Sequence, residues 1–205
     1  MMAHRFDSQL KEIVLDDSLA QLQTGDIVLF RGSRAVSDLI CFMTNSRWSH
    51  IGIVICPQGS PPLLFEATTI TETPDVQTGK PIMRGITLVP LKQRIKQYPG
   101  RVAVRRLEGV KRTERFEQLT SNWVEQWQHQ PYKRYTLAIL IGLLPKPWQI
   151  HLPGLFCSEL VAEYYKKLNC LESKKASCFF VPGDFEHCAQ LELSQGWLST
   201  EYYLK

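Results

Sequence analysis

The chain has 205 residues, 44% of them hydrophobic and 21% charged, with a formal net charge of +4. This size and composition predict a globular protein with a sizeable core and exclude a low-complexity or disordered chain. The small excess of positive charge excludes the strongly basic surface that is typical of nucleic-acid-binding proteins. The first residues are too polar for a secretory signal, and the longest apolar run is far shorter than the roughly 20 residues that span a bilayer. We therefore expect a cytoplasmic protein without an integral membrane segment.

In chain order, the sequence begins with a helix and continues with strands. Leu10, Ile13 and Val14 recur at helical spacing, which predicts a helical extension over residues 1–21 ahead of a single domain over 22–205. The strands are expected over residues 26–31, 49–56, 63–68, 86–89 and 101–107. A turn rich in proline joins the second and third strands, which predicts an antiparallel hairpin with a longer loop.

The second half of the chain changes from strands to helices. Helices are expected over residues 36–43, 113–128, 136–144 and 156–168. The apolar stripe of the second of these is interpreted as core and consists of Phe116, Leu119, Trp123 and Trp127. The polar segment 69–81 is expected to be a surface loop, and the basic stretch 105–112 a solvated surface. Strands followed by helices predict the α+β class, with an antiparallel, barrel-like sheet packed against helices.

Cys157 is the first candidate for chemistry, because it falls at the start of a predicted helix. The first turn of a helix has N–H groups without acceptors and the positive end of the helix dipole. Both features favour the thiolate, which is the reactive form of cysteine. The alternative interpretation is a small buried hydrophobic residue, since free cysteine packs well in cores.

His50 and Glu66 are candidates for the base and the group that orients it. In the strand 49–56, His50 alternates with isoleucines, so its ring faces away from them. Glu66 lies in the neighbouring apolar strand, where a carboxylate is costly unless it has a partner. A hydrogen bond across the hairpin would fix the imidazole for acid–base work. The alternatives are a structural histidine and an edge-strand glutamate that points to water.

Together, Cys157, His50 and Glu66 form the nucleophile, base and orienting group of thiol catalysis. The N–H group of Cys157 is a natural oxyanion donor. Tyr132, Trp48 and Ser158 are the further candidates for substrate or oxyanion binding. His151 is a rival base because it lies close to Cys157 in the sequence.

We predict no metal and no cofactor. The remaining cysteines and histidines near the C-terminus match no zinc-ligand spacing; they are Cys170, Cys178, His187 and Cys188. The six cysteines are irregularly spaced and are expected to be reduced thiols.

Several motifs resemble the circularly permuted papain-like hydrolases, a group that includes NlpC-related, YiiX-like thiol amidases. The motifs are GDIVLFRG (25–32), RWSHIGIVI (47–55), FEA (65–67), QPY (130–132), FCSELVAEYY (156–165) and VPGD (181–184). In ordinary papain-like enzymes the cysteine helix precedes the histidine strand, and the permuted group reverses this order, as here. The resemblance implies a permuted papain-like fold in which Cys157 is the nucleophile, His50 the base and Glu66 the orienting residue.

The resulting hypothesis is a hydrolase that cleaves a peptide or another amide through a covalent acyl-enzyme. One alternative is a thiol-dependent acyltransferase or esterase of the lecithin retinol acyltransferase type, acting on a lipid ester. The other is a non-catalytic binding module on the same scaffold. The substrate, the oligomeric state and the role of the segment 69–85 are left open by the sequence.

Overall fold

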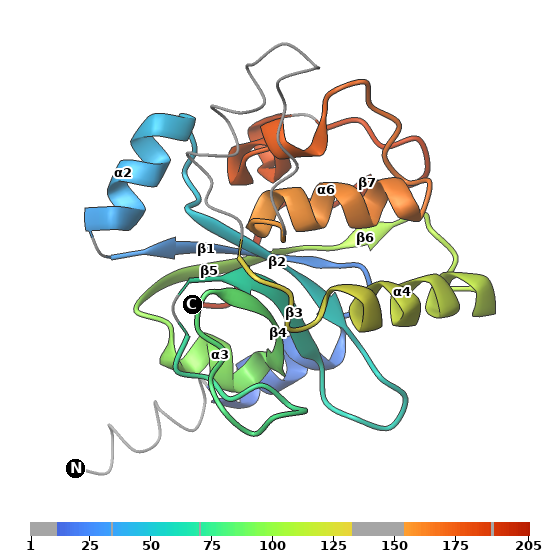
Figure 1. Cartoon of the computed structure of the whole chain (residues 1–205). Coiled ribbons are helices and arrows are strands. Elements are labelled where there is room, and N and C mark those ends of the chain that lie inside the picture. The colour runs from blue at the N-terminus through green and yellow to red at the C-terminus, as the bar shows by residue number, and fades with distance from the viewer. Residues whose placement is uncertain (1–11, 34, 70, 133–153, 190) are drawn as a thin grey trace.

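The centre of the protein is a six-stranded antiparallel sheet (Figure 1), seen in a computed structural model that describes residues 12–33, 35–69, 71–132, 154–189 and 191–205. The strand order is β4-β3-β2-β1-β5-β8. The strands are β1 (Ile27–Gly32), β2 (His50–Ile55), β3 (Leu63–Thr68), β4 (Gly85–Pro90), β5 (Gly100–Arg105) and β8 (Tyr202–Tyr203). In these residues β4 and β8 are edge strands, so the sheet is open where a barrel-like form was expected.

Shorter elements and helices surround this sheet. β6 (Leu107–Glu108) and β7 (Trp197–Leu198) form a separate two-stranded sheet. The helices are α2 (Ala35–Thr44), α3 (Leu91–Gln97), α4 (Glu114–Trp127), α6 (Cys157–Lys167) and a further helix over residues 12–20. Three 3₁₀ turns follow α6, namely η2 (Ser177–Phe179), η3 (Pro182–Phe185) and η4 (His187–Ala189). The α+β prediction is confirmed as a mixed structure with an antiparallel sheet packed against helices.

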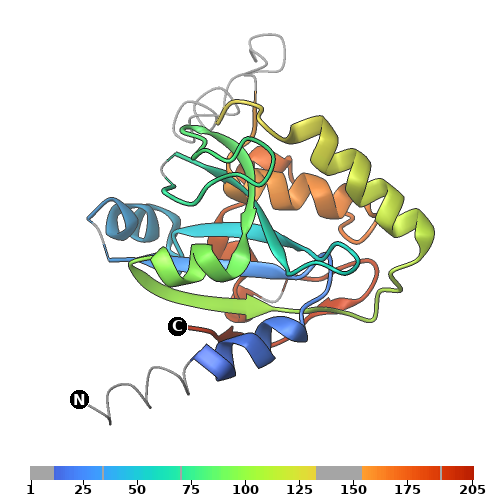
Figure 2. The ribbon, with the colours of Figure 1, turned by 90° about the horizontal axis from the view of Figure 1, so that it is seen from below.

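Helices cover both faces of the sheet (Figures 1 and 2). On one face, α4 and α6 pack on side chains such as Ile51 and Ile53. On the other face, α3 and the helix over residues 12–20 pack on side chains such as Val54. The predicted alternation along β2 is therefore confirmed, and it places His50 on the same side of the strand as Val54.

The N-terminal helix contacts the sheet through residues other than those the sequence indicated. Leu19, near the end of the helix, and Leu22, just after it, are buried in the core that they share with the sheet, whereas Ile13 and Val14 are exposed. The predicted apolar face of this helix was therefore wrong at Ile13 and Val14, while Leu10 lies outside the described residues. Its first turns are bound by ion pairs instead, as in the contact of Glu12 with α3.

Most described residues of the segment 69–81 are exposed, as expected of a surface loop, but the segment also holds buried polar side chains. Thr73 and Asp75 are almost fully buried. The Asp75 carboxylate accepts hydrogen bonds from the hydroxyl of Thr87 and the main-chain N–H of Leu88, both at 3.0 Å. Because this one buried carboxylate accepts from donors of both the loop and β4, it anchors the loop to the sheet.

The basic stretch 105–112 also differs from its expected solvated state. Arg105 is buried and donates to three main-chain carbonyls, those of Phe185, Leu198 and Ser199. Arg112 donates to the carbonyls of Thr24 and Leu107. Arg105 thus binds the C-terminal segment to the sheet, and Arg112 binds the segment before β1 to β6, since each guanidinium group offers five donors in a fixed fork.

The helix α4 begins and packs as its sequence predicts. The Thr113 hydroxyl caps it by accepting from the N–H of Phe116 at 3.3 Å. Phe116 and Trp123 are buried in the core, and Leu119 and Trp127 pack against it. The core interpretation of this stripe is confirmed.

Replacing Thr113 with alanine is expected to lower the free energy of unfolding by about 1 kcal/mol, because an N-cap hydrogen bond is lost. Urea unfolding measures the effect. Thr113→Ser keeps the hydroxyl and is the control that should retain the wild-type midpoint. A Thr113→Ala protein as stable as Thr113→Ser would contradict the capping role.

Candidate active site

Cys157 is the first residue of α6. The preceding residue, Phe156, has an extended backbone (φ −98°, ψ 172°), so the helix begins at the cysteine. The main-chain N–H groups of Cys157 and Ser158 lie in the first turn, where the helix supplies no acceptor. The thiol is largely buried, at 7% exposure, and all six cysteines of the chain are free. The predicted placement of Cys157 at a helix start is confirmed.

The pairing of β2 with β3 places His50 beside Glu66. Ile53 is opposite Phe65 in this antiparallel pair, and the same register places Gly52 opposite Glu66. A Cβ atom on Gly52 would lie 3.2 Å from the Cβ of Glu66, so glycine leaves the carboxylate room to reach the neighbouring imidazole. His50 Nε2 and Glu66 Oε2 are 2.5 Å apart. The expected hydrogen bond across the hairpin is present.

The Glu66 carboxylate is ionised although it is fully buried. Burial raises its pKa, but the charge of Arg94 and the hydrogen bond with His50 lower that pKa to about 2. Arg94 Nε donates to Glu66 Oε1 at 2.7 Å, and Nη2 donates to Oε2 at 3.3 Å. The carboxylate is therefore shared between a guanidinium and an imidazole.

Cys157 lies next to the His50 ring. Burial lowers the pKa of His50, but hydrogen bonds to Cys157 and Glu66, together with their charges, raise that pKa to about 9. Because Glu66 occupies Nε2, the nitrogen left to exchange a proton with the thiol is Nδ1. Three residues distant in sequence thus form a chain of thiol, imidazole and carboxylate.

Arg94 is a further site residue that the sequence pattern did not indicate. It lies on α3, which was not predicted because this helix has seven residues and no side-chain cap. Leu91 and Ile95 are buried on the same helix, four residues apart. That spacing was the available signal, because an arginine between two buried positions shares their face.

The three further candidates lie in different surroundings. The Ser158 hydroxyl donates to the Phe180 carbonyl at 2.7 Å, so it anchors α6 to the following turn. Tyr132 pairs with Leu155 in an isolated parallel bridge, which brings its main chain close to the start of α6. Trp48 is buried, and its indole N–H donates to Glu201 at 3.1 Å. Their binding roles stay predictions.

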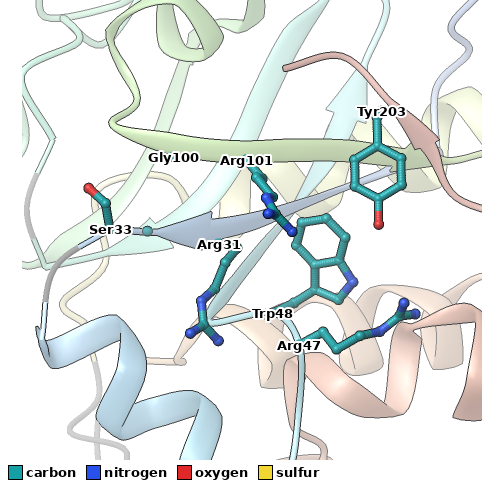
Figure 3. A pocket seen from close by; sticks show the side chains of 8 residues that line it. Arg31, Ser33, Arg47, Trp48, Gly100, Arg101 and Tyr203 are labelled. Carbon is teal, nitrogen blue, oxygen red and sulfur yellow. The ribbon is translucent and has the colours of Figure 1, made fainter.

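Trp48 also lines a pocket of about 530 Å³ that contains none of the three candidate catalytic residues (Figure 3). The charged side chains around it are Arg31, Arg47 and Arg101, and Tyr203 stands at its rim. This pocket is basic and partly aromatic.

The other groupings weighed from the sequence give no site in the structure as far as it is described. In the described residues, no group of three or more His, Cys, Asp or Glu side chains is placed to hold a metal ion. The rival base His151 and the expected helix over 136–144 lie outside the described residues. None of the described helices is long and apolar enough to cross a membrane.

The geometry defines a mixed α+β protein with a candidate thiol–imidazole–carboxylate site. No protein-family model matches the chain, and no curated protein matches it. Among solved structures, the chain is similar to one described as the metalloprotein yiiX from Escherichia coli O157:H7, with 25% sequence identity and a TM-score of 0.48. The match covers 71% of this chain and 66% of the other, so this chain spans just under two thirds of that structure's length.

Proposed function

We propose that this protein is a cysteine-dependent hydrolase that cleaves an amide or peptide bond through a covalent acyl-enzyme. The observation that carries the proposal is the contact of Cys157 with a His50 ring whose other nitrogen is held by Glu66. A pKa of about 9 keeps this ring protonated at neutral pH, and a protonated imidazole beside the sulfur favours the thiolate.

In the proposed reaction, the Cys157 sulfur attacks the carbonyl carbon and forms a tetrahedral intermediate. His50 then gives its Nδ1 proton to the leaving amine as the carbon–nitrogen bond breaks, which leaves a thioester. Water attacks the thioester, and His50 takes the proton from that water. The thiolate leaves, the carboxylic acid is released, and the pair of thiolate and imidazolium is restored.

The negative oxygen of each tetrahedral intermediate needs donors that are fixed in place. The main-chain N–H of Cys157 serves this role, since the first helical turn supplies it no acceptor. Tyr132 is the proposed second donor because its main chain pairs with Leu155 just before α6. By holding Nε2, Glu66 keeps Nδ1 of His50 facing the sulfur while the thioester forms and while it is hydrolysed.

An alkylating thiol probe, followed by peptide mapping, tests this proposal without a known substrate. At pH 6 we expect labelling first at Cys157, although Cys188 is exposed and Cys157 is largely buried. His50→Gln should abolish the preference, because the thiol then lacks its cationic partner. Cys188→Ala is the matched control and should leave Cys157 labelling unchanged. Labelling that simply follows exposure, with Cys188 first, would contradict the proposal.

A further inference from the structure

Arg94 presents a buried cation to the carboxylate that holds the proposed base. Its side chain is only 8% exposed, and its guanidinium carbon lies 5.4 Å from the Phe30 ring centroid and 5.1 Å from that of Tyr98. Aromatic faces on a guanidinium fix its plane and limit its contact with water. The fixed plane aims two N–H groups at Glu66, and no step of the proposed reaction uses them directly.

We propose that Arg94 is a positioning residue for this reaction, keeping Glu66 ionised so that Oε2 accepts the Nε2 proton of His50. This inference rests on the proposed hydrolase function. A protonated Glu66 would instead donate to Nε2, and the remaining imidazole proton would then occupy Nδ1. Since Nδ1 is the nitrogen that faces Cys157, the ring in that state has no acceptor for the thiol proton.

Among the charged and titratable groups around Glu66, Arg94 is the one that can keep the carboxylate ionised throughout the reaction. His50 faces it from β2, Arg94 from α3 and Tyr98 from the end of α3, while Cys157 reaches the network through His50. Of these groups, only Arg94 holds its positive charge at every pH of interest. His50 changes its charge during the reaction, so it is not a permanent counter-ion.

The test is the pH profile of Cys157 alkylation by iodoacetamide, read by peptide mapping in the full-length protein. Wild-type Cys157 should react well below pH 8. Arg94→Met should slow this reaction at pH 6 by about 10- to 100-fold and move the rise in rate to higher pH. Arg94→Lys keeps the charge and should restore part of the rate. Lys96→Met removes an exposed cation from the same helix and should retain the wild-type profile.

The outcomes separate this inference from the proposed function. If wild-type Cys157 reacts only as an ordinary thiol, the hydrolase proposal fails. If wild-type Cys157 reacts at low pH and folded Arg94→Met keeps the same profile, only the role of Arg94 is overturned. Should Arg94→Met fail to fold, Glu66→Gln mimics a protonated Glu66 and is expected to show the same loss. A wild-type profile in Glu66→Gln would equally overturn the inference.

A second inference rests on the basic pocket in Figure 3. The register of β1 with β5 places Arg31 directly opposite Arg101, and both line this pocket with Arg47. Like charges at opposed positions of two strands repel, so an anion between the two guanidinium groups would be stabilised there.

The carboxylates near this pocket leave one of its three cations unpaired. Glu186 and Glu201 both pair with Arg47, whereas Arg31 pairs with Asp38, which is largely exposed. Among the described residues Arg101 has no carboxylate partner. We infer that the pocket binds a small anion through Arg101 and Arg31, by a phosphate or carboxylate group that accepts from both guanidinium groups.

Calorimetric titration with inorganic phosphate and, separately, with citrate at constant ionic strength tests this inference. Arg101→Gln should weaken binding at least about tenfold, whereas Arg115→Gln, an exposed arginine on α4, should have no effect. Tighter binding of phosphate than of citrate would show that the pocket favours a phosphate group. Tighter binding of citrate would show that it favours a carboxylate group. Binding that is equal in both variants, or absent in the wild type, would overturn the site. Cys157→Ala should bind like the wild type, because Cys157 does not line the pocket.

Discussion

Glu66→Leu is expected to lower the free energy of unfolding by about 3–5 kcal/mol, because it leaves the buried charge of Arg94 without its partner. The carboxylate is fully buried and receives both the guanidinium and the imidazole. Removing it costs more than the hydrogen bonds that are lost, since a buried cation without a counter-ion is strongly disfavoured. Urea unfolding at pH 7 measures the change.

The double variant Glu66→Leu/Arg94→Met should recover most of this loss. It replaces a buried ion pair with apolar side chains of similar volume, an exchange that is often neutral or stabilising. It should nevertheless leave Cys157 unreactive at pH 6, because the Nε2–H group of His50 then has no carboxylate to donate to. The matched surface pair, Glu12→Leu/Lys96→Met, should leave the unfolding midpoint nearly unchanged, since exposed ion pairs contribute little. A double variant as unstable as Glu66→Leu alone would contradict this account.

The sequence predicted the elements whose residue pattern repeats along the chain. Alternating apolar residues indicated β2 and β3, and because the two strands form a hairpin, the register that brings His50 to Glu66 followed from that local signal. The stripe that includes Phe116 and Trp123 likewise indicated α4. Cys157 was identifiable because a helix start is itself encoded locally, by an apolar pattern that begins after Pro153 and Gly154.

The features that the sequence did not predict depend on tertiary contacts. Arg94, Arg105 and Asp75 are charged residues, and residue type alone favours exposure for all three. Each is buried because distant groups supply its partners, as β3 does for Arg94 and the C-terminal segment does for Arg105. The short strand β8 escaped prediction for the same reason, since its two residues pair with β5 from the far end of the chain.

In the Cys157→Ser background, where no thiol titrates beside the ring, stability is expected to fall as the pH rises from about 6.5 to 9, and adding His50→Gln should remove this part of the slope. Below the unfolded-state pKa of about 6.5 the ring is protonated in both states, so its stabilising contribution is complete. As the pH rises through the folded-state pKa of about 9, the contribution is lost. The difference between these two pKa values of His50 corresponds to a contribution of roughly 3 kcal/mol at most to the free energy of unfolding. Urea unfolding at several pH values between 6 and 9 measures it.

The comparison of Cys157→Ser with Cys157→Ser/His50→Gln isolates the imidazole from other titrating groups, because it removes the thiol that titrates together with the ring. Glu66 contributes above its unfolded-state pKa and loses that contribution only as the pH falls toward 2, outside this window. Burial raises the pKa of the Cys56 and Cys170 thiols, which lowers stability at alkaline pH, but it does so equally in both proteins. His187→Gln changes an exposed histidine and, in the same Cys157→Ser background, should leave the curve unchanged. Parallel curves for Cys157→Ser and Cys157→Ser/His50→Gln would mean that Glu66 does not hold the folded-state ring protonated.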